Sequence, residues 1–262
     1  MKSDGCALYY EEVGAGVPIL LVHPAGATAS TWGPTIERLA RIGRVIAYDR
    51  RGYARSEAET VTSVSRHTAD AAVILEHLAS TPAVVVGISA GATITIDLAV
   101  RRPDLVQVAI AHEAPWRATR HLPSAAQVGA LAKIGSLTLL GRHGAAADAL
   151  LRAAYSYRDG GTAWDAFPEE WRQTAMENAQ PALADFRMTV GDYPSARDLA
   201  SIKVPVVCSY GARSPNLMAR FTQSLASAIP TGRLHRIDGS AHAAPFDAPT
   251  GFVELIAGAM TL

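Results

Sequence analysis

The stretch that decides the fold is AVVVGISAG at residues 83–91. Its first four residues form an apolar run of the kind found in buried strands, and the G-x-S-x-G pattern that follows is typical of a sharp turn between a strand and a helix. Glycines at both ends of the turn let the two elements approach without Cβ clashes. We therefore expect Ser89 to project from the carboxyl end of a central strand, beside a helix N-terminus that favours negative charge.

The segment after this turn is predicted to be a helix that ends near Pro103. Residues 93–96 read TITI, an alternation rich in β-branched side chains that by itself favours a strand. Propensity is a weak guide when a strand-and-turn pattern directly precedes the segment, so the helix is the better prediction.

Further apolar runs predict the rest of the sheet. They lie at residues 19–22, 45–48, 106–111, 204–208 and 234–237, and helical patterns occur between most of them. This alternation predicts the α/β class, with a mostly parallel central sheet flanked by helices. The runs at 8–13 and 19–23 are separated only by GAGVP, and they predict an antiparallel hairpin that leads into the sheet.

The alternation stops between residues 114 and 199, a segment that is Ala-rich and helical in pattern. We expect a single domain whose core is formed by residues 1–113 and 200–262, with residues 114–199 inserted as a helical cap, or lid. The scattered aromatic residues of this segment contact a ligand or form the cap's own core, and the sequence leaves both interpretations open.

Composition narrows the range of partners. The chain has 262 residues with 24 Lys plus Arg and 24 Asp plus Glu, so no excess charge favours binding to nucleic acid or to an anionic membrane. The first residues lack the apolar region of a signal peptide, and no later stretch is long and apolar enough to span a bilayer. The two cysteines, Cys6 and Cys208, fit reduced thiols better than a disulfide or a metal cluster. These features predict a cytoplasmic protein without a metal.

A serine nucleophile needs a base, and His242 follows the last predicted strand, where a loop can return toward Ser89. The chain resembles the α/β-hydrolase fold family in four places: the His23-Pro24 loop, the turn at residues 49–56, the G-x-S-x-G turn and the loop around His242. The resemblance implies a serine hydrolase with the chain order nucleophile, acid, histidine.

The acid departs from the family's commonest pattern, in which an aspartate lies in the loop that is here residues 210–215. Ser214 stands where that aspartate is expected, and a serine cannot carry the charge that stabilises an imidazolium. The family has a second location for the acid, at the end of the strand after the G-x-S-x-G helix, and Glu113 falls there. Glu113 is therefore the predicted acid, with Asp238 as the alternative.

Acyl transfer also needs donors for the oxyanion. The residue after the nucleophile supplies one N–H group, here that of Ala90, and the loop after the first central strand supplies the other. Pro24 has no N–H, so the second donor is predicted to be Ala25.

The strand end at residues 112–115, the stretch GTAW at residues 161–164 and residues 193–199 resemble the fungal zearalenone lactone hydrolases, which also use a glutamate at the location of Glu113. Leu183 stands where those enzymes carry a cap tryptophan that packs on the macrolactone. We predict substrate contacts for four residues, namely Trp116, Trp164, Leu183 and Phe186.

The predicted function is hydrolysis of a small-molecule carboxylic ester or lactone without a cofactor. A cofactor-free C–C bond hydrolase and a small-molecule receptor with vestigial catalysis remain alternatives, and a homodimer is left open. A dinucleotide-binding oxidoreductase is disfavoured because no G-x-G-x-x-G motif follows the first central strand.

Overall fold

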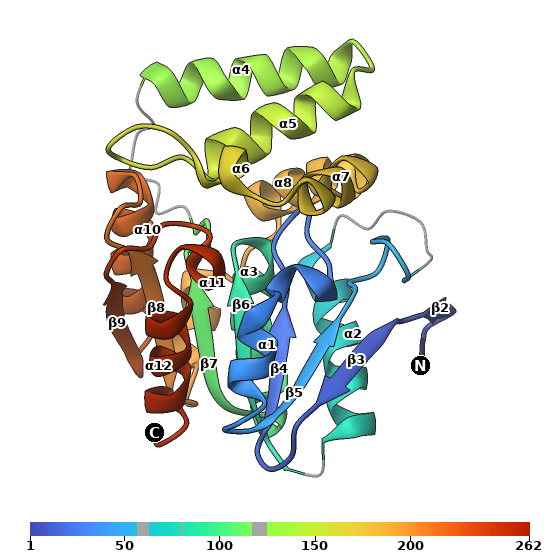
Figure 1. Cartoon of the computed structure of the whole chain (residues 1–262). Helices are drawn as coiled ribbons and strands as arrows, with labels where there is room; N and C mark the ends of the chain where they lie inside the picture. Colours follow the sequence, from blue (N-terminus) through green and yellow to red (C-terminus); the bar gives the residue numbers. More distant parts are fainter. Residues whose placement is uncertain (57–62, 80, 117–124) are drawn as a thin grey trace.

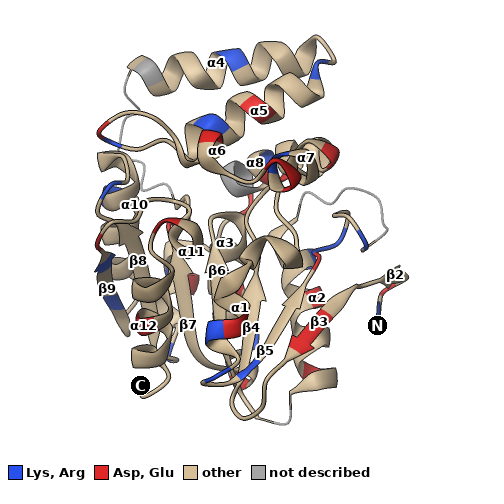
Figure 2. Cartoon of the chain, viewed as in Figure 1, with Lys and Arg blue, Asp and Glu red and all other residues tan. Residues whose placement is uncertain are grey.

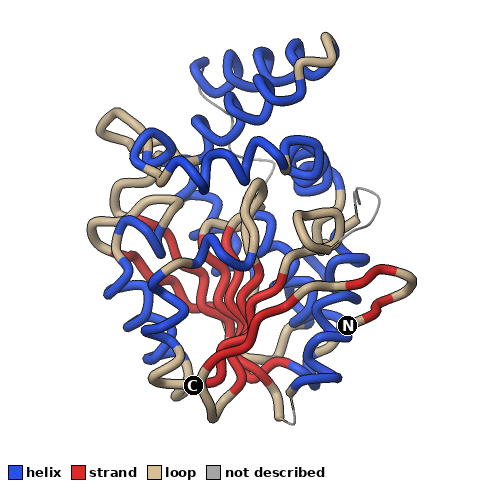
Figure 3. Tube along the Cα trace, turned by 45° about the vertical axis from the view of Figure 1, so that its right-hand side comes forward, coloured by secondary structure: helices blue, strands red, loops and turns tan. Residues whose placement is uncertain are grey.

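The computed structural model describes residues 1–56, 63–79, 81–116 and 125–262. Its centre is a twisted sheet with helices on both faces (Figures 1 and 3). The seven strands, in their order across the sheet, are β3 (Tyr10–Val13), β5 (Arg44–Tyr48), β4 (Pro18–Val22), β6 (Ala83–Ile88), β7 (Val106–His112), β8 (Val206–Gly211) and β9 (Gly232–Ile237). All neighbouring pairs are parallel except β3 with β5. The predicted fold class is confirmed.

The predicted hairpin of residues 8–13 and 19–23 is wrong. Strand β3 pairs with β5, in the register Tyr10 to Tyr48, and β5 separates it from β4. The reason lies in the polarity of the two strands. Every residue of β4 is buried, which requires a neighbour on each side, whereas β3 carries Glu11 and Glu12 and has no buried residue, as suits an edge strand.

Helices cover the two faces of the sheet through separate apolar clusters. One cluster includes Ile74, Ile94 and Leu225, and the other includes Leu39 and Phe252. The first face is covered by α2 (Val64–Leu78), α3 (Ala90–Arg101) and α10 (Asn216–Ala228), and the second by α1 (Pro34–Leu39) and α12 (Pro249–Ala259). Residues 93–96 lie within α3, so packing against the sheet overrides their strand-like alternation.

Between β7 and β8 the described residues form helices and loops, with one isolated bridge between Ser156 and Thr162. The helices are α4 (Ala125–Leu139), α5 (His143–Ala154), α6 (Ala163–Ala166), α7 (Glu169–Glu177), α8 (Ala179–Gly191) and α9 (Ala196–Ser201). Figure 1 shows α4 to α8, which we call the cap helices, stacked above one end of the sheet. That end is where the parallel strands terminate, and it is the usual place for a ligand in such sheets.

Charged residues of both signs are spread over the helices, strands and loops in Figure 2. In the described parts of the chain, no helix has the length and apolar character needed to cross a membrane.

Candidate active site

Ser89 lies on the turn between β6 and α3 and has a φ of 55°, which is rare for a residue with a side chain. The positions of Gly87 and Gly91 leave no room for a Cβ atom. A Cβ on Gly91 would lie 2.0 Å from the carbonyl oxygen of Val22, and a Cβ on Gly87 would lie 2.2 Å from that of Gly91. The close approach of strand and helix thus holds Ser89 in a strained conformation, half-buried at the carboxyl end of the central strand β6.

Glu113 and His242 form a buried pair. Glu113 directly follows β7 and has a φ of 48°, and its N–H donates to the carbonyl of Ser209 at 2.9 Å. Its Oε2 lies 2.8 Å from Nδ1 of His242, and both side chains are at most 3 % exposed. Because an ionised carboxylate can only accept a hydrogen bond, the proton of the imidazole is on Nδ1, and Nε2 is left able to accept the proton of Ser89.

The second oxygen of the carboxylate is held as well. Glu113 Oε1 accepts the N–H of Gly211 at 3.0 Å and a hydrogen bond from the Ser214 hydroxyl. Burial alone would raise the pKa of Glu113, but the hydrogen bond from His242 and the Gly211 N–H outweigh burial and bring that pKa to about 2. Ser214, which stands where the common aspartate is expected, therefore contacts the acid at the other location.

A second histidine braces the loop that carries His242. Burial lowers the pKa of His112, so its ring is neutral. Its Nε2 lies 3.0 Å from the carbonyl oxygen of Ala241, which can only accept, so the proton is on Nε2. Its Nδ1 then accepts from the Ser209 hydroxyl at 3.0 Å. Ala241, the residue before His242, is thereby fixed to the last residue of β7, which directly precedes Glu113.

Asp238, the alternative acid, lies elsewhere. Its side chain is 79 % exposed and pairs with Arg236 at 3.0 Å, while Nδ1 of His242 is occupied by Glu113.

The two predicted oxyanion donors, Ala25 and Ala90, line one cavity together with Ser89. Neither main-chain N–H has an acceptor among the described residues. The loop of Ala25 is fixed by His23, whose Nδ1 donates to the carbonyl of Pro24 at 2.8 Å and whose Nε2 accepts the N–H of Arg50 at 2.9 Å.

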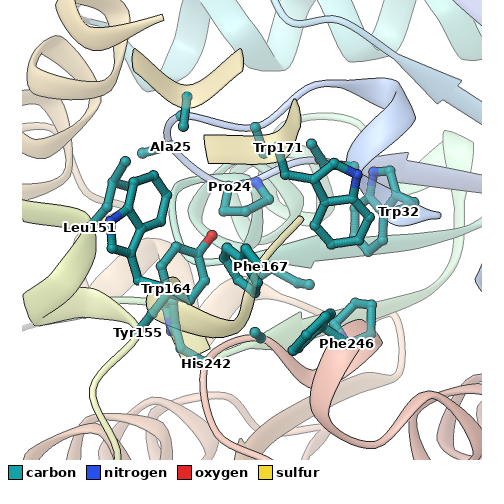
Figure 4. A pocket seen from close by; sticks show the side chains of 17 residues that line it. Pro24, Ala25, Trp32, Leu151, Tyr155, Trp164, Phe167, Trp171, His242 and Phe246 are labelled. Atoms are coloured by element: carbon teal, nitrogen blue, oxygen red, sulfur yellow. The ribbon is translucent and has the colours of Figure 1, made fainter. Parts of the chain in front are cut away.

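Two cavities meet at this site. The larger, of about 280 Å³, contains Ser89 and Ala90, and the smaller, of about 50 Å³, is lined mainly by aromatic rings (Figure 4). Five residues line both, namely Pro24, Ala25, Leu151, Tyr155 and His242. The remaining aromatic residues of the smaller cavity are Trp32, Trp164, Phe167, Trp171 and Phe246.

The predicted substrate contacts fall in different places. Trp164 lines the smaller cavity and Phe186 the larger. Leu183 packs with Ile134 in an apolar cluster within the cap helices, and Trp116 packs against the main core. Neither Leu183 nor Trp116 is among the residues that line these two cavities.

Helix α8 is fixed to the core by three side chains spaced seven residues apart, Asn178, Asp185 and Asp192. Asp185 accepts two hydrogen bonds from the Arg50 guanidinium, one of them at 3.1 Å, and one from the Tyr53 hydroxyl. Asp185, Arg50 and Tyr53 are all buried. The outer two accept main-chain N–H groups, Asn178 from Ala54 at 3.0 Å and Asp192 from Val64 at 2.7 Å. Seven residues make about two helical turns, so the three contacts lie on one face of α8.

Two residues of this site give only a weak signal in the sequence. Ser214 reads as a missing acid, and Tyr155 is one aromatic residue among many in the inserted segment. Tyr155 could have been singled out only by knowing that the end of α5 lies over His242.

In the described ranges, no group of three or more His, Cys, Asp or Glu residues could hold a metal ion.

The sheet order, the G-x-S-x-G turn and the cap helices together define an α/β-hydrolase fold. Solved structures agree: Est816, an N-acyl homoserine lactone degrading enzyme, superposes with a TM-score of 0.78 over 98 % of both chains, at 24 % identity. A model of the alpha/beta hydrolase family matches residues 19–255, and the chain belongs to this family.

Two curated relatives match most of the chain. The putative carbamate hydrolase RutD of Azorhizobium caulinodans is 28 % identical over 268 residues, which cover 96 % of this chain and 94 % of RutD. The zearalenone hydrolase of Bionectria ochroleuca is 25 % identical over 221 residues, covering 81 % and 78 %. Other relatives match at a higher identity of 33–38 %, but over only 105–116 residues, and the chain spans only about 40 % of their length.

Proposed function

We propose that this protein hydrolyses a carboxylic ester or lactone through an acyl-enzyme formed on Ser89. The observation that carries the proposal is the 2.8 Å contact between Glu113 and Nδ1 of His242, in a site where His242 and Ser89 line the same cavity. This arrangement matches the roles of nucleophile, base and orienting acid in serine hydrolases.

In the proposed mechanism the Ser89 hydroxyl attacks the carbonyl carbon while His242 Nε2 takes its proton. The negative charge that develops on the carbonyl oxygen is stabilised by the N–H groups of Ala25 and Ala90. His242 then returns the proton to the leaving oxygen, and a water molecule releases the acyl group by the same steps in reverse order. Glu113 stays ionised throughout and stabilises the imidazolium.

The substrate class is inferred from the cavities and from the relatives. Apolar side chains dominate the lining of both cavities, which favours an ester or lactone with apolar substituents. Two relatives that match most of the chain are a zearalenone hydrolase and a putative carbamate hydrolase, both of which are hydrolases by name.

The test combines labelling and turnover. A fluorophosphonate probe should label Ser89 in the wild type, and Ser89→Ala should lose both labelling and hydrolysis of lactones and p-nitrophenyl esters of graded chain length. Ser201→Ala, which changes an exposed serine on α9, serves as the matched control. The proposal is wrong if Ser89→Ala keeps its activity or if the probe labels another residue. Faster turnover of diketones than of esters would instead favour C–C bond hydrolysis.

A further inference from the structure

Tyr155 occupies a central position between the cap helices and His242. It follows α5, lines both cavities and is 8 % exposed. Its ring stacks on Trp164 at a centroid distance of 6.5 Å, meets Phe167 edge to face at 4.9 Å, and contacts the imidazole ring of His242 at 5.3 Å. These contacts fix the ring in one orientation.

No hydrogen bond joins the Tyr155 hydroxyl to another residue in the part of the chain that the structure describes. In Figure 4 it points away from the Tyr155 backbone into the cavity, toward Pro24. The hydroxyl is not one of the fully buried polar atoms that lack a partner, so it is open to the cavities that Tyr155 lines. A polar group placed in a mostly apolar pocket is the kind that orients a ligand there, and we expect the partner of this hydroxyl among the atoms that fill the cavity during the reaction.

The chemistry of the hydroxyl limits what that partner can be. Burial raises the pKa of Tyr155 above the ordinary tyrosine value, so the hydroxyl keeps its proton and can donate. Two substrate oxygens are candidates. The carbonyl oxygen already has two main-chain donors, Ala25 and Ala90, whereas the leaving oxygen must approach His242 to receive its proton, and His242 is the ring that Tyr155 contacts.

We propose that the Tyr155 hydroxyl donates a hydrogen bond to the leaving oxygen of the ester or lactone. This inference rests on the proposed function. When the tetrahedral intermediate collapses, the carbon–oxygen bond breaks, its electron pair goes to the leaving oxygen, and the proton on His242 Nε2 passes to that oxygen. Tyr155 keeps its own proton and stabilises the charge that builds up before the transfer is complete.

The contribution of such a donor depends on the leaving group. A nitrophenoxide spreads its charge over the ring and needs little stabilisation, whereas an aliphatic alkoxide concentrates the charge on oxygen. We therefore expect Tyr155→Phe to keep most of the wild-type kcat/KM for nitrophenyl esters. For aliphatic esters of the same acid it should lose about 10- to 100-fold, as for one hydrogen bond to a charged atom.

The experiment measures kcat/KM for esters of one acid whose alcohols run from nitrophenols through phenol to aliphatic alcohols. Tyr157→Phe is the matched control, because Tyr157 donates to Asp247 at 2.7 Å and lines neither cavity. The expected result is a steeper dependence on alcohol acidity in Tyr155→Phe only. An equal loss across the series would mean that Tyr155 only packs or serves the carbonyl oxygen, and no loss would leave it without a role; either result overturns the proposal.

Fluorophosphonate labelling separates this proposal from the proposed function. If Ser89 is labelled in Tyr155→Phe but the leaving-group dependence is unchanged, only the role of Tyr155 is wrong. If Ser89 is not labelled in the wild type, both proposals fail together.

Discussion

Replacement of Glu113 by glutamine tests the site most sharply, because the surrounding donors dictate how the new side chain must lie. The Gly211 N–H and the Ser214 hydroxyl both donate to the position of Oε1, so the amide oxygen of glutamine must occupy it. The amide NH2 group is then forced to face Nδ1 of His242, where the carboxylate oxygen was 2.8 Å away.

A facing NH2 group donates to Nδ1, so the imidazole must carry its proton on Nε2. That tautomer presents N–H to Ser89 and cannot accept the serine proton. The corresponding change of aspartate to asparagine in a serine protease triad lowers kcat by about 10⁴, which is about 5.5 kcal/mol of transition-state stabilisation. We expect a loss of this size for Glu113→Gln, with little change in KM.

The assay is steady-state hydrolysis of a p-nitrophenyl ester, with circular dichroism to check the fold. Asp238→Asn is the matched control, since Asp238 is mostly exposed and pairs only with Arg236 among the described residues. The reasoning is refuted if Glu113→Gln loses less than about tenfold, or if Asp238→Asn loses as much as Glu113→Gln.

Two further predictions concern the free energy of unfolding, measured with urea. Gly91→Ala should lower it by about 3 kcal/mol or prevent folding, because the new Cβ would lie 2.0 Å from a main-chain carbonyl oxygen. Gly258→Ala has open space for its Cβ and should raise it by about 0.5–1 kcal/mol. Burial, with a smaller contribution from the charge of Arg50, lowers the pKa of His67 from 6.5 to about 4. Between these two pH values the unfolded chain binds a proton at His67 and the folded chain does not, so the free energy of unfolding of the wild type falls as the pH falls from 6.5 to about 4. His67→Leu should remove about 2 kcal/mol of that fall between pH 7 and pH 5, and an unchanged pH dependence would contradict the assignment.

The periodic apolar runs allowed most of the fold to be predicted from the sequence, since each buried strand needs a continuous run and each covering helix needs an apolar face. The order of strands was harder. Local turn residues suggested that residues 8–13 pair with their neighbours in sequence, but the burial of β4 on both sides required a different partner. Strand order depends on which strands can tolerate an edge, and a turn signal does not carry that information.

The candidate site shows the same limit at the level of single residues. Ser89 and Glu113 lie at strand ends that the pattern could locate. The partners of Glu113 are separated from it by about a hundred residues in sequence, 101 for Ser214 and 129 for His242. Ser214 was interpreted as a lost acid because a serine carries no charge, but a hydroxyl can still donate to a carboxylate, and only the folded chain brings the two together.

The three contacts along α8 have a consequence for how a substrate reaches Ser89. Movement of α8 away from the core would separate the buried ion pair of Asp185 and Arg50, and breaking such a pair costs about 3–5 kcal/mol. A conformer with α8 raised would then make up roughly one molecule in 10² to 10⁴. Helix α4 is held far less firmly, because Ile134 is its only buried residue among those described. Helix α8 is thus held in place, whereas α4 has little buried surface among its described residues to oppose its movement. We therefore expect the access of a substrate to Ser89 to depend on movement of α4.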